Sequence, residues 1–384
     1  MDFSSLRNSF REFGGAFEGV PGAQLIPSFS PILEEEYTPA PEQMDEDRRL
    51  TRGETWVVEA EEPSEDFVRD FMKPEQNFEF AYFVDGSVRS VRALDGREGN
   101  FIFPVVVAQV GAASIKRENG MPTPHIIKTE TVLLLPLSSL SDTLQSRVEN
   151  RLNSTPLLIA DTTDTVAEKD YSELRALASR KAKNLMTKTE GSVVMKCFGS
   201  HFDKQHLIAV DGSLFTLLAE ANVPEDKLDR LVGVSKSFSM RPLILMQEYL
   251  NRDDCIGRLV SLKNGQRTDA IELHIDKHWV VTWYQRIHPP ERVESSLEGI
   301  VKVEVHPCDY PALKSKKSKE KRNLGNWSGR WDAIANLVYS ERLPVPFHEQ
   351  RWHALLYPVY CCERLLKSSF LSAETLRGLC AAIA

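Results

Sequence analysis

Hydrophobic runs typical of β-strands dominate residues 78–137. The segment 78–94 predicts a strand that runs into an Asp-Gly-Ser sequence beginning at Asp85, and a second strand that leaves from it. The segments 100–115 and 125–137 are equally rich in β-prone residues, and their connections are short. Three such strands predict an antiparallel meander. Because the strands are apolar on both faces, we expect helices to cover them.

From residue 170 the apolar positions recur every three or four residues, which predicts a long helix over 170–198. Its apolar stripe comprises Leu174, Leu177, Ala178, Ala182, Leu185 and Met186. The segment 206–218 predicts a buried strand that reaches a second Asp-Gly-Ser, and 231–238 predicts the next strand. A short helix at 224–230, opened by a proline, lies between them.

The last third of the chain combines further strands with helices. The segment 299–305 alternates apolar and polar residues and predicts an edge or barrel-like strand. The remaining predicted elements are strands at 270–275 and 278–287 and helices at 331–341, 351–368 and 372–383. This order predicts a mixed α/β fold.

The first part of the chain has a different character. Residues 4–18 form an amphipathic helical pattern, and a proline-rich stretch with an acidic run follows over residues 21–41. Prolines and charges at this density argue against a packed core. We therefore divide the chain into an N-terminal helix and extended arm, 1–77, and an α/β domain, 78–384. The arm either docks a partner or frays.

Composition narrows the function classes. The net charge of −8 argues against a protein that coats nucleic acid by bulk charge, but leaves room for an enzyme that holds DNA locally. No stretch approaches about 18 consecutive apolar residues, and the N-terminus lacks the order of a secretion signal. We expect a cytoplasmic protein that does not enter a membrane. The six cysteines have no zinc-binding spacing and are expected to be reduced and structural.

The Asp-Gly-Ser sequence occurs twice, at Asp85 and at Asp211, each time after a hydrophobic strand. An aspartate at the end of a buried strand is unfavourable unless something neutralises it, and a divalent cation does so. The glycine that follows permits a tight turn or a close ligand approach. Two such aspartates from different strands could share one Mg²⁺ or Mn²⁺ ion. The alternative is that each aspartate caps its own turn.

A third carboxylate follows from helical spacing. Met186, Glu190, Val193 and Cys197 lie at steps of four, three and four, which places Glu190 on the inward face of its helix. A buried glutamate beside two aspartates is the set used in two-metal phosphodiester hydrolysis. Glu190 could instead pair with a nearby lysine or arginine, and Gly191 could break the helix there.

In this order, the motifs resemble those of the NurA nucleases. The shared features are a strand ending in Asp-Gly-Ser, a long helix with a glutamate, a strand ending in Asp-Gly-Ser-Leu and a Val-Gly-Val-Ser-Lys element ending at Lys236. The strand 300–304 resembles the family's strand of alternating hydrophobic, basic and acidic residues, and Tyr357-Pro358 resembles its C-terminal Tyr-Pro. The resemblance covers residue 78 to about residue 368.

The resemblance implies an RNase H-like, Piwi-related fold, a mixed sheet flanked by helices, with an N-terminal extension and C-terminal helices. It implies Mn²⁺-dependent, or Mg²⁺-dependent, cleavage of DNA by a homodimer that works with a hexameric HerA-type ATPase. Carried over to this chain, the metal ligands are Asp85, Glu190 and Asp211. Lys236 is a candidate for contacting the scissile phosphate, or else an exposed lysine at a strand end.

The chain departs from the family at one position. The family has a histidine about two helical turns after its Tyr-Pro, where this chain has Leu365. Three neighbouring side chains are candidate replacements: Glu363, Arg364 and His353.

A basic segment near residue 320 is a candidate for DNA contacts, or else a solvated loop. Its candidate residues are Lys316, Lys317, Lys319, Lys321 and Arg322. Trp327 and Trp331, which follow, either stack on bases or belong to the core. No phosphate-binding Gly-x-x-x-x-Gly-Lys-Ser/Thr sequence is present, so we do not expect the chain itself to hydrolyse ATP.

We therefore predict a metal-dependent deoxyribonuclease with catalytic residues Asp85, Glu190, Asp211 and Lys236, acting in DNA end processing or phage defence. The alternative is a non-catalytic adaptor on the same fold that binds DNA or the ATPase. A guide-dependent, Argonaute-like nuclease is a weaker third possibility, because the chain has little room for guide-binding domains.

Overall fold

The computed structural model describes residues 3–27, 55–59, 64, 66–71, 78–163, 170–199, 205–250, 253–275, 278–306, 327–344 and 352–381. None of the helices in these ranges is long and apolar enough to cross a membrane. The cysteines in these ranges are free thiols.

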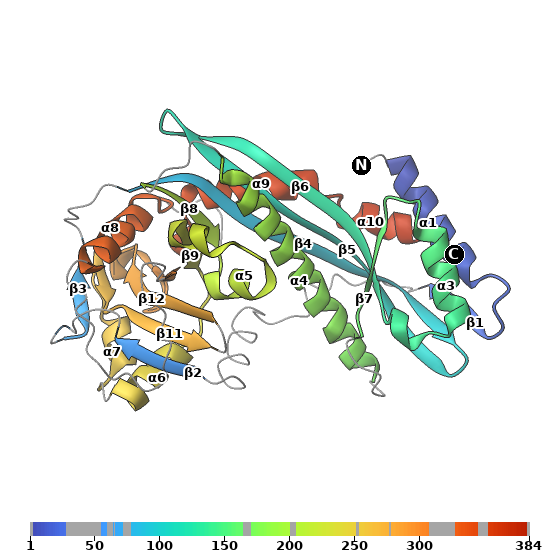
Figure 1. Cartoon of the computed structure of the whole chain (residues 1–384), viewed down its shortest axis with the longest axis horizontal. Helices are drawn as coiled ribbons and strands as arrows, with labels where there is room; N and C mark the ends of the chain where they lie inside the picture. The colour runs from blue at the N-terminus through green and yellow to red at the C-terminus, as the bar shows by residue number, and fades with distance from the viewer. Residues whose placement is uncertain are drawn as a thin grey trace.

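All thirteen strands of the described residues belong to one sheet. They are β1 (Ala23–Pro27), β2 (Thr55–Glu59), β3 (Val68–Asp70), β4 (Glu79–Glu98), β5 (Phe101–Glu118), β6 (Met121–Leu135), β7 (Leu158–Asp161), β8 (His206–Asp211), β9 (Leu231–Ser235), β10 (Gln266–Thr268), β11 (Ile271–Ile275), β12 (His278–Arg286) and β13 (Ile300–Val305). The helices are α1 (Phe3–Phe17), α3 (Asp142–Leu152), α4 (Tyr171–Cys197), α5 (Leu214–Glu220), α6 (Arg241–Leu250), α7 (Cys255–Val260), α8 (Trp327–Ser340), α9 (Tyr357–Ser369) and α10 (Ala373–Cys380). The long axis of the molecule follows the three long strands β4, β5 and β6 (Figure 1). The helices α1, α3 and α10 lie at one end, and a unit of strands and helices that includes β11, β12, α6 and α7 lies at the other.

The centre of the sheet has the strand order β6-β5-β4-β8-β9. Among the first three strands, each is antiparallel to its neighbour, whereas β8 and β9 run parallel to β4. The long helix α4, which follows β7 and precedes β8 in the chain, covers one face of the sheet, and α9 covers the other (Figure 1). This order and these directions are those of an RNase H-like sheet, which confirms the predicted fold class.

The two faces of β5 show how the helices are divided between the faces of the sheet. Ala108 and Val110 pack with Ala178 and Ala182 of α4, whereas Ala113 packs with Leu366 of α9. This alternation follows from the period of two along a strand. Since every β5 residue from 103 to 115 is buried, both faces of the strand are covered, as its apolar run predicts.

Two strand boundaries differ from the prediction. The first Asp-Gly-Ser does not end a strand: β4 continues through it as one strand of 20 residues. In the second, the strand ends at Asp211 and the helix α5 begins at Leu214, where a strand was predicted to continue. After the first motif, apolar residues mix with Arg89, Ser90 and Arg92, and after the second the residues are mostly apolar. Over four or five positions, neither pattern separates a strand from a helix.

The segment 299–305 was predicted to be an edge or barrel-like strand. It forms a strand, but the prediction that this strand lies at the edge of the sheet is wrong. The strand β13 lies between β12 and β9, and all six of its residues are buried. Its alternation is real, but the polar residues Lys302 and Glu304 pair with each other inside the protein instead of facing water. A buried ion pair therefore imitates the pattern of a solvent-facing strand.

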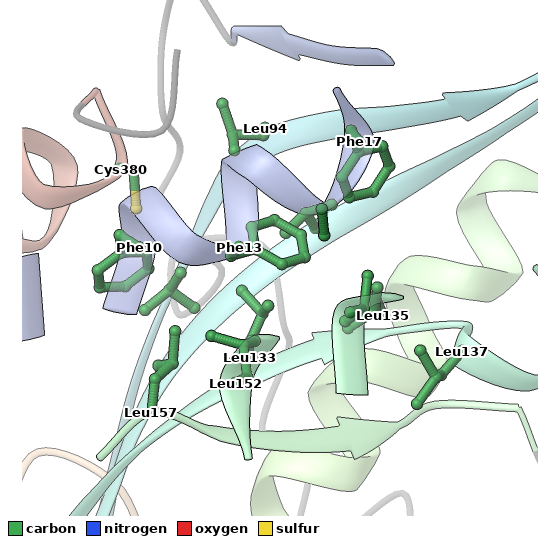
Figure 2. Close-up of a cluster of buried hydrophobic side chains, with 14 of the residues drawn as sticks. Phe10, Phe13, Phe17, Leu94, Leu133, Leu135, Leu137, Leu152, Leu157 and Cys380 are labelled. Atoms are coloured by element: carbon green, nitrogen blue, oxygen red, sulfur yellow. The ribbon is translucent and has the colours of Figure 1, made fainter. Parts of the chain in front are cut away.

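The N-terminal helix α1 belongs to the core. Phe10, Phe13 and Phe17 are buried against Leu94 of β4 and Leu133 of β6 (Figure 2). The strand β1 pairs with the end of β4, while β2 and β3 pair with β11 and β10 at the opposite end of the sheet. The apolar face of α1 is thus occupied within the chain, and is not free to dock a partner.

Removing an aromatic ring from α1 should destabilise the protein strongly. Phe13 is 0% exposed, so we expect Phe13→Ala to lower the free energy of unfolding by about 3–5 kcal/mol. Phe3, on the same helix and 48% exposed, is the matched control, and Phe3→Ala should change it by less than about 0.5 kcal/mol. Urea denaturation measures both variants. Equal effects would contradict the placement of α1 in the core.

Candidate functional site

The parallel pairing of β4 with β8 brings the two aspartates together. Val84 pairs with Val210, and Asp85 and Asp211 are the next residues of their strands. Since β8 ends at Asp211, β4 has no strand partner on that side within the described residues until β1 pairs with it at Leu94–Glu98, while it stays paired with β5 on the other side. Asp85 is 4% exposed. The two carboxyl groups interact electrostatically at the place where the sheet opens.

The two glycines of the motifs have different tasks. Gly212 has a φ of +97°, a conformation that favours glycine, and its N–H donates to the carbonyl of Val234 at 2.9 Å. Gly86 leaves space: a Cβ there would lie 2.4 Å from Oε1 of Glu190. One glycine therefore permits the turn after β8, and the other lets a carboxylate approach the backbone of β4.

Glu190 reaches the site from α4, as its helical spacing predicts. It is 6% exposed and lies over Gly86. The helix does not break at Gly191, where a Cβ would lie 2.3 Å from Cβ of Ala221. This glycine instead allows α4 to pack closely against the end of α5. The alternative that Gly191 interrupts the helix is wrong.

Lys236, one residue beyond β9, forms an ion pair with Asp211. Its Nζ is 2.7 Å from Oδ2 of Asp211, and its side chain is 11% exposed. Burial works against the charged form, but Asp211 and Asp85 outweigh it and raise the pKa of the lysine. Lys236 is therefore a buried cation among carboxylates, which excludes the alternative of an exposed lysine at a strand end.

A further carboxylate comes from α9, on the opposite face of the sheet from α4. The Sγ of Cys362 donates to the carbonyl of Phe83 at 3.3 Å, two residues before Asp85. Glu363, the next residue, acts electrostatically on both Asp85 and Lys236. Glu363 also forms an ion pair with Lys367 at 2.7 Å.

Glu363 is thus the candidate replacement for the histidine that borders the site. Arg364 is exposed, and Leu365 packs among apolar residues. The Nδ1 of His353 accepts a hydrogen bond from the backbone N–H of Gly299 at 3.1 Å, so that side chain is held elsewhere. The sequence could not select among the three, because the answer depends on how α9 packs against β4.

Negative charge is concentrated at this place. Burial, followed by the charge of Asp211, raises the pKa of Asp85 well above its usual value of 3.8. Glu190 and Glu363 raise it further, and Lys236 opposes them. Three acidic side chains, from β8, α4 and α9, and the lysine Lys236 therefore act on Asp85 of β4.

The donor set suits a hard divalent cation, since carboxylate oxygens are the ligands that Mg²⁺ and Mn²⁺ prefer. Within the described residues, no three acidic, histidine or cysteine side chains are close enough together to hold a metal ion. The ammonium group of Lys236 is bound to Asp211 instead. A cation at this site would have to compete with that lysine for Asp211.

The other predicted site residues lie apart. The basic residues of 314–323 fall outside the described residues, as does the side chain of Trp327. Trp331 is 1% exposed and packs against Trp283, so it belongs to the core and does not stack on bases. Glu304 contacts the turn after β8, although the sequence analysis did not assign it to the site. The feature that could have identified it is an acidic residue within an otherwise apolar strand.

Comparison with protein families and with curated proteins gives no match. Among solved structures, the NurA nuclease from Sulfolobus solfataricus is similar to this chain, with a TM-score of 0.42 and 12% sequence identity. The similarity covers 82% of this chain and 86% of that one.

Neutralising Asp85 should stabilise the protein at high pH. Because the folded state raises the pKa of Asp85, its favourable contribution is present at low pH and is lost as pH rises through the folded pKa. We expect Asp85→Asn to unfold at higher urea concentration than the unmodified protein at pH 8 with EDTA, and the difference to shrink toward pH 5.

The control is Asp142→Asn, which changes an exposed carboxylate in the first turn of α3. Its urea midpoint should stay close to that of the unmodified protein at both pH values. An Asp85→Asn protein that is less stable at pH 8 would contradict the electrostatic account of the site.

Proposed function

We propose that this protein is a metal-dependent nuclease that hydrolyses phosphodiester bonds in DNA. The observation that supports this best is the meeting of Asp85, Glu190, Asp211 and Glu363 around Lys236 where β8 leaves β4. Lys236 pairs with Asp211 and Lys367 pairs with Glu363, so two lysines face four carboxylates. These groups match the chemistry of a site that binds a divalent cation next to a phosphate.

Each side chain then has a distinct task. Asp85, Glu190 and Asp211 would hold the ion, with Glu363 as a further oxygen ligand from the opposite face. A bound divalent ion supplies an activated water and stabilises charge on the phosphate oxygens. Lys236, once released from Asp211, provides a point charge for a non-bridging phosphate oxygen. The small volume of Gly86 keeps the carboxylate of Glu190 beside β4.

The finer assignments rest on the resemblance of the motifs. They are Mn²⁺ rather than Mg²⁺, a homodimer, a hexameric HerA-type ATPase as partner, and DNA end processing or phage defence in the cytoplasm. The basic segment containing Lys316 and Lys317, which lies outside the described residues, would then contact DNA.

An adaptor without catalytic activity is the second candidate. The ion pair between Lys236 and Asp211 favours it, because the lysine holds an oxygen that the metal would need. The absence of the family's histidine favours it as well. Such a protein would bind DNA or an ATPase on the same fold without cleaving DNA.

Cleavage of DNA separates the two candidates. We expect Asp211→Asn and Asp85→Asn each to lower the rate of Mn²⁺-dependent degradation of linear DNA at least about 100-fold, because each removes a charged ligand. Asp142→Asn is the control and should cleave at the unmodified rate. The assay is run with the full chain, alone and with a hexameric HerA-type ATPase. No cleavage by the unmodified protein would support the adaptor, and full activity in both site variants would contradict the assignment of Asp85 and Asp211 to the site.

Glu363 can be tested in the same assay. We expect Glu363→Ala to lower cleavage by about 10–100-fold, and Glu363→His, which restores a metal-binding side chain, to recover part of the loss. Arg364→Ala, one residue further along α9 and exposed, is the matched control. A Glu363→Ala protein that cleaves as fast as the Arg364→Ala protein would remove Glu363 from the site.

A further inference from the structure

The ion pair inside β13 is unusual for its depth in the fold. Lys302 and Glu304 point to the same side of the strand, their side chains are 0% and 1% exposed, and Nζ lies 2.8 Å from Oε1. A pair as buried as this is weak support for stability, because removing both charges from water offsets most of their attraction. Stability alone therefore does not explain why this ion pair is buried in β13.

The second oxygen of Glu304 supplies an explanation. Oε2 accepts a hydrogen bond from Oγ of Ser213 at 2.8 Å and another from the backbone N–H of Phe215 at 3.3 Å. Ser213 is the residue that precedes α5, but its own side chain does not cap that helix. A carboxylate from another strand thus holds both the motif's serine and the first turn of α5.

The turn that Glu304 holds begins at Asp211. Gly212 is fixed on its other side by its hydrogen bond to Val234. The turn rests on Gly233, where a Cβ would lie 2.7 Å from the backbone nitrogen of Leu214. In the sheet, Gly233 is the residue of β9 that pairs with Glu304. The backbone after Asp211 is therefore clamped between β9 and the carboxylate of β13.

We propose that the Lys302–Glu304 pair positions the Asp211-Gly212-Ser213 turn, so that Asp211 can bind a divalent cation. Lys302 fixes one oxygen of Glu304, which aims the other at Ser213 and Phe215. Glu304 is a positioning residue: it acts on the site through Ser213 and does not contact the ion. The part of this inference that concerns the cation rests on the proposed function.

The experiment compares Glu304→Ala, Glu304→Gln and Ser213→Ala with a matched control. The control is Asp332→Ala, which breaks another ion pair with a buried partner, because Arg267 is 0% exposed and its Nε lies 2.7 Å from Oδ1 of Asp332. Three quantities are measured on the full chain: the urea midpoint, hydrogen exchange of the amides of residues 211–216, and the Kd for Mn²⁺ by calorimetry.

Glu304→Ala should speed amide exchange in 211–216 and weaken Mn²⁺ binding by about 10–100-fold, as loss of a residue behind a metal ligand does. Glu304→Gln, which keeps an oxygen acceptor, should recover part of both. Ser213→Ala leaves no buried charge unpaired and should fold even where Glu304→Ala does not, with smaller changes in the same direction. Asp332→Ala should lower the urea midpoint and leave the exchange of 211–216 and the Mn²⁺ affinity unchanged.

Exchange and Mn²⁺ affinity like those of the unmodified protein in both Glu304→Ala and Ser213→Ala would overturn the inference. Equal effects of Asp332→Ala would also overturn it, because the role would then be general stability. Failure of the nuclease proposal gives a different result: the unmodified protein binds Mn²⁺ without cleaving DNA, and the exchange data still decide whether Glu304 positions the turn.

Discussion

The site depends on the end of one strand pairing. After Val84 and Val210, β8 turns away, and the described residues leave a gap on that side of β4 before β1 pairs with it at Leu94. This opening lets side chains from both faces of the sheet meet at one place: Glu190 comes over Gly86 from α4, and Glu363 comes from α9. If β8 continued beside β4, Asp85 would lie within a closed sheet, where helices on the two faces could not share a site.

The charges of the side chains at this opening then determine which groups pair with one another. The pKa of Asp85 is raised well above its usual value, because the residue is buried and faces other carboxylates. Lys236 offsets part of the charge through Asp211. A divalent cation would offset more of it and would release the lysine toward a phosphate. The same groups therefore explain why the arrangement is stable without an ion and why an ion would be attracted to it.

The sequence predicted the parts of this site that follow local patterns. The repeated Asp-Gly-Ser after apolar strands identified Asp85 and Asp211, and helical spacing placed Glu190 inward. That β4 continues through the motif as one strand could not be predicted, because Asp-Gly-Ser is a sequence typical of turns. The central place of β13 was hidden by Lys302 and Glu304, whose pairing imitates a solvent-facing strand. The place of Glu363 beside Asp85 depends on how α9 packs against β4. The two residues are about 280 positions apart in the sequence, and no local pattern encodes such a contact.

The unfavourable features of the structure bear on whether the site is active or decayed. An adaptor needs neither a buried Asp85 among carboxylates nor a lysine–glutamate pair inside β13, and apolar residues of similar volume would make the same sheet more stable. Buried charge of this kind is costly and tends to persist where an activity requires it. The Lys302–Glu304 pair contacts the turn after β8, and the space left by Gly86 admits the carboxylate of Glu190. In the proposed nuclease, Lys236 would hold Asp211 until a cation took its place.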